Sequence, residues 1–131
     1  MELTVDRDDF LESVSLVQSV VDRRNTMPVL TNLYLEAHES ELCLRSMGLQ
    51  VAMEVRCAAK VTALGRTTVS ARRLFSILRE LPALPVSFRS DQDDWISLSC
   101  GNADFKLVGI SADRYPSFPE LAPAADSAKQ G

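Results

Sequence analysis

Residues 68–78 read TVSARRLFSIL, and residues 4–14 read TVDRDDFLESV. Each stretch has a β-prone Thr-Val pair, then a residue suited to cap a helix, then apolar residues at helical spacing. Matching positions lie 64 residues apart in the two stretches. We therefore predict an internal duplication in which a strand leads directly into an amphipathic helix in each half.

The first half is predicted to continue with strands after its helix. Residues 2–5 alternate polar and apolar side chains, and Asp6 is placed to cap a helix over about 7–22. Apolar and polar residues then alternate with a period of two in three further segments, near residues 33–37, 42–44 and 51–57. This period is typical of half-buried antiparallel strands.

The second half repeats the same order of elements. A strand at 66–69 leads to Ser70, which is placed to cap a helix that ends at Leu81, before Pro82. Gly101-Asn102 has the composition of a hairpin turn. Three further strands are predicted, near residues 86–88, 95–98 and 105–110.

Together the halves predict an α+β fold. Two pseudo-symmetric β-α-β-β-β halves, about residues 1–59 and 64–110, are expected to form one domain over residues 1–120. Their two helices should lie side by side, packed on antiparallel sheet. Residues 121–131, rich in Pro, Ala and polar side chains, are predicted to be a flexible tail or the start of an interdomain linker.

Composition excludes several classes of protein. The 131 residues carry a formal net charge of −4, and 46% of them are hydrophobic, which is typical of one folded domain. No apolar stretch reaches the ~20 residues that cross a bilayer, and the acidic N-terminus is not a signal peptide, so a cytoplasmic location is expected. The three cysteines include no CxxC pair, which argues against a disulfide framework or a zinc site.

No catalytic or metal-binding motif stands out in the sequence. His38 is the only histidine and lies in a polar His-Glu-Ser turn. Asp91, Asp93 and Asp94 lack the glycine and distal glutamate of an EF-hand loop, so we interpret them as a solvated hairpin turn. Because no glycine loop for phosphate and no nucleophile motif is found, we predict no catalytic residue, no metal and no cofactor.

Charge is distributed unevenly along the chain. Between Arg56 and Arg89 there are seven basic residues and one acidic residue, Glu80, which gives this segment a net charge of +6. The remainder of the chain carries −10. The acidic total therefore excludes a surface that is basic all over, but it allows one local basic face.

Arginines of the predicted helices are candidate phosphate contacts. Arg72 and Arg73 occupy the first turn of the second helix, where the helix macrodipole disfavours cations by roughly 0.3–1 kcal/mol each. Helical spacing puts Arg79 on the same face as Arg72. This face is either simply solvated or turned toward phosphates. Arg23 and Arg24, at the end of the first helix, favour phosphates because pseudo-twofold symmetry places both helices on one side.

Several stretches of the chain resemble a known family. They are LTVDR at residues 3–7, RNTMPVLTNL at 24–33, TTVSARRLF at 67–75, and FKL at 105–107 with DRYPSFP at 113–119. Together they resemble the first domain of the bacterial DNA polymerase III beta subunit, the sliding clamp. The resemblance covers about residues 1–120.

The resemblance implies a function in DNA replication. Clamps of this family are homodimeric rings of three-domain subunits, whose helices line a hole through which double-stranded DNA passes. The ring is a non-catalytic processivity factor that contacts the DNA backbone without sequence specificity, tethers the replicative DNA polymerase and also meets the clamp loader. Arg24, Arg72 and Arg73 match DNA-facing or adjacent positions, and Phe105 and Leu107 match the edge strand that meets the partner subunit.

The chain also departs from the family pattern. Residues 47–50 read MGLQ where members commonly have Thr-Asp-Leu-Glu, so an altered loop is expected. Asn102 and Asp104 stand where basic residues often precede the interface phenylalanine. The sequence corresponds to one domain of three, so it is either a clamp fragment or a one-domain relative, and by itself a monomer or weakly self-associating. The alternative function is a stand-alone clamp-fold protein-interaction module without a role on DNA.

Overall fold

The computed structural model describes residues 1–120, and the predicted tail over 121–131 lies outside them. The elements follow in the order β1 (Glu2–Asp6), α1 (Arg7–Gln18), η1 (Pro28–Thr31), β2 (Asn32–Ala37), β3 (Glu41–Met47), β4 (Ala52–Ala58), β5 (Lys60–Ala63), β6 (Gly65–Ser70), α2 (Ala71–Glu80), β7 (Pro85–Ser90), β8 (Trp95–Cys100), β9 (Ala103–Val108) and η2 (Ala112–Arg114), where η marks a short 3-10 helix. In this part of the chain, no helix is long and apolar enough to cross a membrane.

The strands form two antiparallel sheets, and each half of the chain contributes to both. One sheet has the order β5-β1-β7-β8-β9, and the other has the order β4-β3-β2-β6. Strand β1 of the first half pairs with β7 of the second, with Leu3 opposite Phe88. Strand β6 pairs in the same way with β2, with Val69 opposite Leu33. This exchange joins the two β-α-β-β-β units, and the predicted α+β class is confirmed.

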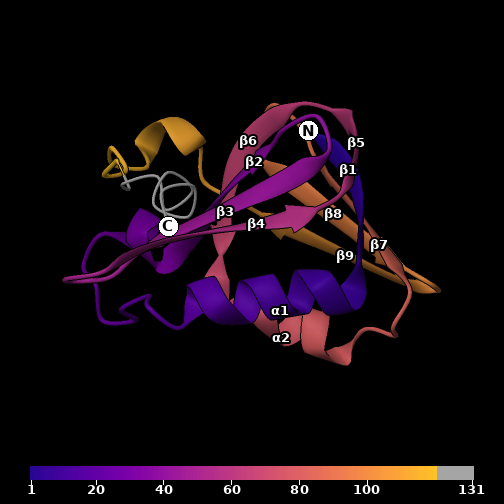
Figure 1. The fold of residues 1–131 in the computed structure, drawn as a ribbon, viewed down its shortest axis with the longest axis horizontal. Helices are drawn as coiled ribbons and strands as arrows, with labels where there is room; N and C mark the ends of the chain where they lie inside the picture. The colour runs from indigo at the N-terminus through magenta and orange to yellow at the C-terminus, as the bar shows by residue number, and fades with distance from the viewer. Residues whose placement is uncertain (121–131) are drawn as a thin grey trace, which may run out of the picture.

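One apolar core is shared by both sheets and both helices. The helices lie side by side along one edge of the molecule, with the sheets above them (Figure 1). Phe10 of α1 meets Phe88 of β7 edge to face, with ring centroids 6.2 Å apart. Leu74 and Leu78 of α2 are fully buried. Because burial of such a side chain stabilises the fold by roughly 1.5–3 kcal/mol, these residues determine which face of α2 stays exposed.

Both helices begin at the predicted cap, but α1 ends earlier than expected. The Asp6 side chain accepts a hydrogen bond from the Asp9 N–H, and the Ser70 side chain accepts one from the Arg73 N–H. Helix α1 ends at Gln18, whereas periodicity predicted an end near residue 22. At Ser19, both the backbone N–H and the hydroxyl donate to the carbonyl oxygen of Leu16, which tightens the last turn.

Strand β5 does not appear in the sequence-based prediction. It has four residues, too few for a clear period of two, and three of them are exposed. Its pairing with β1, with Lys60 opposite Thr4, brings together segments far apart in the chain. Local pattern alone therefore could not identify it.

The segment after β9 returns to the other sheet. Ile110 bridges to Thr68 of β6, and Tyr115 packs against Tyr34 of β2 with ring centroids 5.5 Å apart. The Arg45 guanidinium lies 5.4 Å from the centroid of the Tyr34 ring and 5.0 Å from that of Phe118. These contacts attach the end of the described chain to the four-stranded sheet.

Candidate nucleic-acid interface

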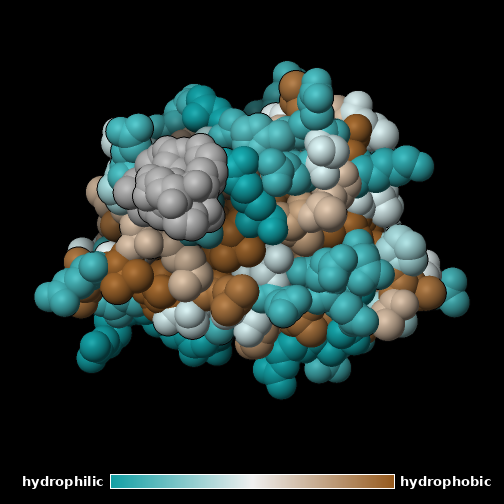
Figure 2. Space-filling model, viewed as in Figure 1, coloured by the Kyte–Doolittle hydropathy of each residue, from teal (hydrophilic) through white to brown (hydrophobic). Residues whose placement is uncertain are grey.

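Helices α1 and α2 run antiparallel, so each end of the pair contains the start of one helix and the end of the other. At one end, the Arg7 Nε–H donates to the carbonyl oxygen of Leu81, 2.9 Å away. At the other end, a pocket is lined by Gln18 of α1 together with Ser70 and Ala71 at the start of α2. Hydrophilic side chains dominate the lower rim of the molecule, where the helices lie (Figure 2).

The first turn of α2 presents two free arginines. Ala71 and Leu74 are buried, while Arg72 and Arg73 between them are exposed. Neither guanidinium forms an ion pair within residues 1–120. Both lie where the helix N-terminus adds its own positive potential, so this end of α2 attracts anions.

Residues after α1 extend this basic end. Arg23 lines the same pocket as Arg72, although the two are far apart in the sequence. Arg24 projects outward with 94% of its side chain exposed, and its Nε lies 3.9 Å from the Asp22 carboxylate. The structure thus places Arg23 in one pocket with Arg72, while Arg24, which the resemblance singled out, extends from the neighbouring position into solvent.

Arg79 lies in a different electrostatic environment at the other end of α2. Its guanidinium stands over the Phe75 ring, 5.5 Å from the centroid. It lines a shallow groove with Asp8 and Glu12 of α1. The exposed helix face is therefore basic around Arg72 and mixed in charge around Arg79.

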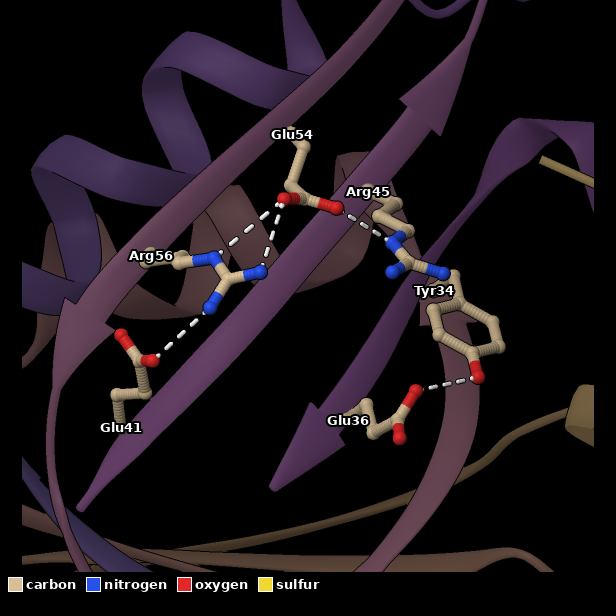
Figure 3. A network of polar contacts seen from close by, with 6 residues as sticks. All are labelled: Tyr34, Glu36, Glu41, Arg45, Glu54 and Arg56. Carbon is tan, nitrogen blue, oxygen red and sulfur yellow. Dashed lines mark hydrogen bonds and ion pairs between the residues drawn. The ribbon is translucent and has the colours of Figure 1, made fainter. Parts of the chain in front are cut away.

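Two other arginines of the positive segment, Arg56 and Arg66, form ion pairs away from the helices. Arg56 on β4 contacts Glu41 at 3.1 Å and Glu54 at 3.4 Å, and Glu54 also binds Arg45 at 2.8 Å (Figure 3). Arg66 on β6 pairs with Asp113 at 2.7 Å. The +6 segment of the sequence therefore does not form one basic face in three dimensions.

The Arg45–Glu54–Arg56 cluster also changes the acidity of its carboxylate. Burial would raise the pKa of Glu54, but the hydrogen bond and charge of Arg45, helped by Arg56, outweigh it and hold the pKa below its ordinary value. Glu54 thus remains ionised and keeps both arginines on the outer face of the four-stranded sheet. This cluster is structural and lies apart from the helices.

Strand β9 is an edge strand of the five-stranded sheet. Phe105 and Leu107 point to the core side, opposite Leu98 and Ile96 of β8. Phe105 is 36% exposed. Leu107 is half-buried and lines a pocket with the two α2 arginines, so the basic end of α2 adjoins this edge.

The acidic turn between β7 and β8 has a structural role. The Asp91 side chain accepts hydrogen bonds from the backbone N–H groups of Asp93 and Trp95. Asp94 has a positive φ of 63° and accepts a hydrogen bond from the Thr67 hydroxyl. Within residues 1–120, no group of His, Cys, Asp and Glu side chains is arranged to hold a metal ion.

Two sequence relatives carry the same description. The beta sliding clamp of Caulobacter vibrioides is 33% identical over 119 residues, which cover 88% of this chain and 32% of that protein. The beta sliding clamp of Streptomyces coelicolor is 32% identical over 124 residues, which cover 95% of this chain and 33% of that protein. The chain thus spans about a third of the length of these relatives.

Solved structures show the same fold. The DNA polymerase sliding clamp from Caulobacter crescentus matches with a TM-score of 0.86 and 32% identity, over 92% of this chain and 33% of that one. The sliding clamp from Pseudomonas aeruginosa, bound to griselimycin, matches with a TM-score of 0.85 and 30% identity, over 93% of this chain and 33% of that one.

A family model agrees with these likenesses. The model described as DNA polymerase III beta subunit, N-terminal domain, matches residues 1–119. The resemblance seen in the sequence motifs is therefore confirmed over nearly the whole described chain. The chain belongs to the family of DNA polymerase III beta subunit N-terminal domains.

Proposed function

We propose that this chain acts in DNA replication as the first domain of a sliding clamp. In this role its helices face double-stranded DNA inside a ring, and the ring tethers the replicative DNA polymerase. The domain itself performs no chemistry, so any polymerase activity belongs to its partner. The basic end of the helix pair, where Arg72 and Arg73 stand exposed without carboxylate partners in residues 1–120, is the observation that carries the proposal.

We expect the arginines to contribute unequally to the attraction for DNA phosphates. Arg72 and Arg73 add their charge to the positive end of α2, and Arg24 reaches outward from the neighbouring loop. Arg79 is included because it shares the exposed face of α2, but Asp8 and Glu12 beside it reduce the local attraction for phosphate. Contact is therefore expected to be strongest at the start of α2 and weakest at its end.

Such a contact favours mobility on DNA over tight binding. Arginines that meet phosphates release counterions but read no bases, so binding depends on salt and not on sequence. One domain offers few phosphate contacts, and we expect its affinity alone to be too weak for physiological salt. Retention on DNA then comes from a closed ring that encircles the duplex.

Strand β9 is the proposed contact with a neighbouring subunit. Phe105 and Leu107 offer apolar surface at an edge whose backbone has no strand beyond it in residues 1–120. Pairing with another strand there would extend the sheet and cover both side chains. In the homodimeric ring, contacts with the polymerase and the clamp loader belong to the complete clamp. The match to clamps does not favour the alternative of an interaction module without a role on DNA.

A charge-matched pair of variants tests the DNA contact. Fluorescence anisotropy with a labelled duplex of arbitrary sequence, at about 50 and 200 mM salt, measures affinity and its salt slope. The double variant Arg72→Glu/Arg73→Glu is expected to lose binding at low salt. The control Arg89→Glu/Arg114→Glu changes the net charge equally on exposed residues of β7 and η2, and it should bind nearly as well as the natural chain.

Equal loss of affinity in both double variants would contradict the assigned face, because it would show a response to net charge alone. Binding that resists 200 mM salt or selects one DNA sequence would contradict the backbone-contact mechanism, since counterion release would then not dominate. A single Arg79→Glu variant should weaken binding less than Arg72→Glu does.

A further inference from the structure

The loop after α1 carries Arg23 and Arg24 at the corner of a tight turn. The Asn25 N–H donates to the carbonyl oxygen of Asp22, 3.1 Å away, so residues 22–25 form a β-turn with the two arginines at its centre. The Asp22 carboxylate accepts a further hydrogen bond from the Arg24 N–H, at 2.9 Å. Aspartate favours the first position of a turn because its side chain can bond to the backbone two residues on. Asp22 therefore fixes the turn that carries both arginines.

This turn sends its two arginines in different directions. Arg23 lines the pocket that Arg72 also lines, at the start of α2. Arg24 extends into solvent, with 94% of its side chain exposed. The chain is held on the far side of Arg24 as well, because the Asn25 side-chain oxygen accepts a hydrogen bond from the Met27 N–H at 2.9 Å. The direction of Arg24 is thus set by hydrogen bonds to the backbone on both sides of it.

Asp22 also brings a negative charge to the basic end of the helix pair. Its carboxylate lies 3.9 Å from the Arg24 Nε. The other arginines of this end form no ion pair within residues 1–120; they are Arg23, Arg72 and Arg73. The Asp22 side chain is only 19% exposed and is bonded to the backbone, so its charge stays beside Arg24 when the guanidinium turns to another partner.

We propose that Asp22 positions Arg24 for DNA phosphates and at the same time weakens the contact that Arg24 makes. This role rests on the proposed function, in which Arg24 reaches toward DNA. The ion pair at 3.9 Å is longer than a hydrogen bond and is screened by solvent, so a phosphate that accepts two hydrogen bonds from the guanidinium displaces it. The Asp22 carboxylate then repels the same phosphate. A contact that forms and breaks readily suits a domain that moves along DNA.

Two variants separate the two effects of Asp22. Asp22→Asn keeps a side-chain oxygen for the Arg24 N–H but removes the charge. In fluorescence anisotropy at about 50 mM salt it should bind a labelled duplex about threefold more tightly, with a salt slope steeper by up to about 0.9. Asp22→Ala removes the acceptor together with the charge. Because the turn then loosens, its gain in affinity should be smaller than that of Asp22→Asn.

A matched control removes the same charge from a different ion pair. Asp113 of η2 pairs with Arg66 of β6 at 2.7 Å, away from the helices. Asp113→Asn changes the net charge by the same amount, so it reports only the long-range attraction, which is screened over about 10 Å at 0.1 M salt. We expect Asp113→Asn to raise the affinity for duplex DNA less than Asp22→Asn does.

The effect of the Asp22 charge should depend on Arg24. In the Arg24→Gln background, Asp22→Asn should change the affinity less than it does in the natural chain, because the two residues are coupled. Hydrogen exchange of the Arg24 amide, measured by NMR, gives a readout without DNA. Exchange should be faster in Asp22→Ala and little changed in Asp22→Asn. Circular dichroism verifies that each variant keeps its fold.

Several outcomes would overturn this role. Equal gains in Asp22→Asn and Asp113→Asn, or no gain in either, would show that the Asp22 charge has no local effect. A gain in Asp22→Ala as large as that in Asp22→Asn would show that the turn does not position Arg24. A natural chain that binds no duplex at about 50 mM salt would overturn the proposed function together with this role. Loss of binding in Arg72→Glu/Arg73→Glu without a response to Asp22→Asn would overturn this role alone.

Discussion

Single residues show where close packing limits the choice of amino acid. A Cβ at Gly109 would collide with the carbonyl oxygen of Thr68, at the point where the chain leaves β9 for β6. A Cβ at Gly48 would collide in the same way with the carbonyl oxygen of Val20, so the turn between β3 and β4 lies against the chain after α1. The loop expected from MGLQ at residues 47–50 is thus shaped by contact with a distant segment.

Replacement of Gly109 by alanine should destabilise the protein. The new methyl group collides with the Thr68 carbonyl oxygen and lies 3.2 Å from both the Ile96 Cδ1 and the Thr67 Oγ1, so the cost is about 1–3 kcal/mol. Urea unfolding followed by circular dichroism measures it. Gly101→Asn is the control, because asparagine tolerates the φ of +59° found there and the nearest atom is the flexible end of the Leu84 side chain, 3.3 Å away. Equal losses in both variants would contradict the collision.

The lowered pKa of Glu54 makes stability depend on pH. A carboxylate whose pKa is depressed by folding stabilises the native state above its unfolded pKa, and this contribution is lost as pH falls. We expect the free energy of unfolding to decrease below about pH 4.5, the ordinary value for this group. Glu54→Gln should flatten that acid limb, whereas Glu120→Gln, at an exposed position, should not. Identical slopes in all three proteins would refute the assignment.

At the scale of elements, helix α2 has an unfavourable charge at its start, which its cap and its buried side chains offset. Its first turn carries two arginines against the macrodipole, and it is held in place by the Ser70 cap and by buried Leu74 and Leu78. Helix α1 has the opposite character, with Asp8 and Asp9 in its first turn. Antiparallel packing sets the acidic start of α1 beside the end of α2, which leaves the start of α2 basic.

Substitutions at the α2 cap should separate these two properties. Ser70→Ala removes the acceptor for the Arg73 N–H and should cost about 1 kcal/mol of stability. Ser70→Asp keeps a cap and suits the macrodipole, so stability should be retained, but its negative charge beside Arg72 should weaken DNA binding at low salt. Thermal unfolding and anisotropy measure the two effects. Unchanged DNA binding in Ser70→Asp would argue against a contact at this end of α2.

At the scale of the whole molecule, strand exchange makes the two halves interdependent. Strand β1 completes the sheet of the second half, and β6 completes that of the first. Neither half can therefore bury its apolar side chains without the other.

Unfolding should consequently be a single cooperative transition. The fluorescence of Trp95, the only tryptophan, reports on the five-stranded sheet, and far-UV circular dichroism reports on both sheets and both helices. Their urea transitions are expected to coincide, as in a two-state domain of this size. Two separated transitions would show that the halves unfold independently, contrary to the exchanged topology.

The parts of the fold and of the candidate site that could be predicted from the sequence are those that depend on nearby residues. Capping residues and periodicity identified both helices and most strands, because these features depend on neighbours a few residues away. They missed β5, because its partner β1 is far away in the sequence. They also placed the end of α1 too late, although the hydrogen bonds from Ser19 to Leu16 that tighten its last turn are local. For the candidate site, the sequence predicted that Arg72 and Arg73 lie in the first turn of the second helix, but the position of Arg23 beside Arg72 depends on the path of the chain after α1.

The amino-acid sequence by itself determined the duplicated order of elements, the family and the arginines at the start of the second helix. Only the tertiary structure decided which basic residues stay free, because ion pairing depends on segments brought together from far apart. Arg56 and Arg66 belong to the same positive stretch as Arg72, yet carboxylates from β3, β4 and η2 neutralise them. Glu54 is a local partner, two residues from Arg56, but Glu41 and Asp113 lie 15 and 47 residues from their arginines along the chain, and no local pattern encodes those contacts.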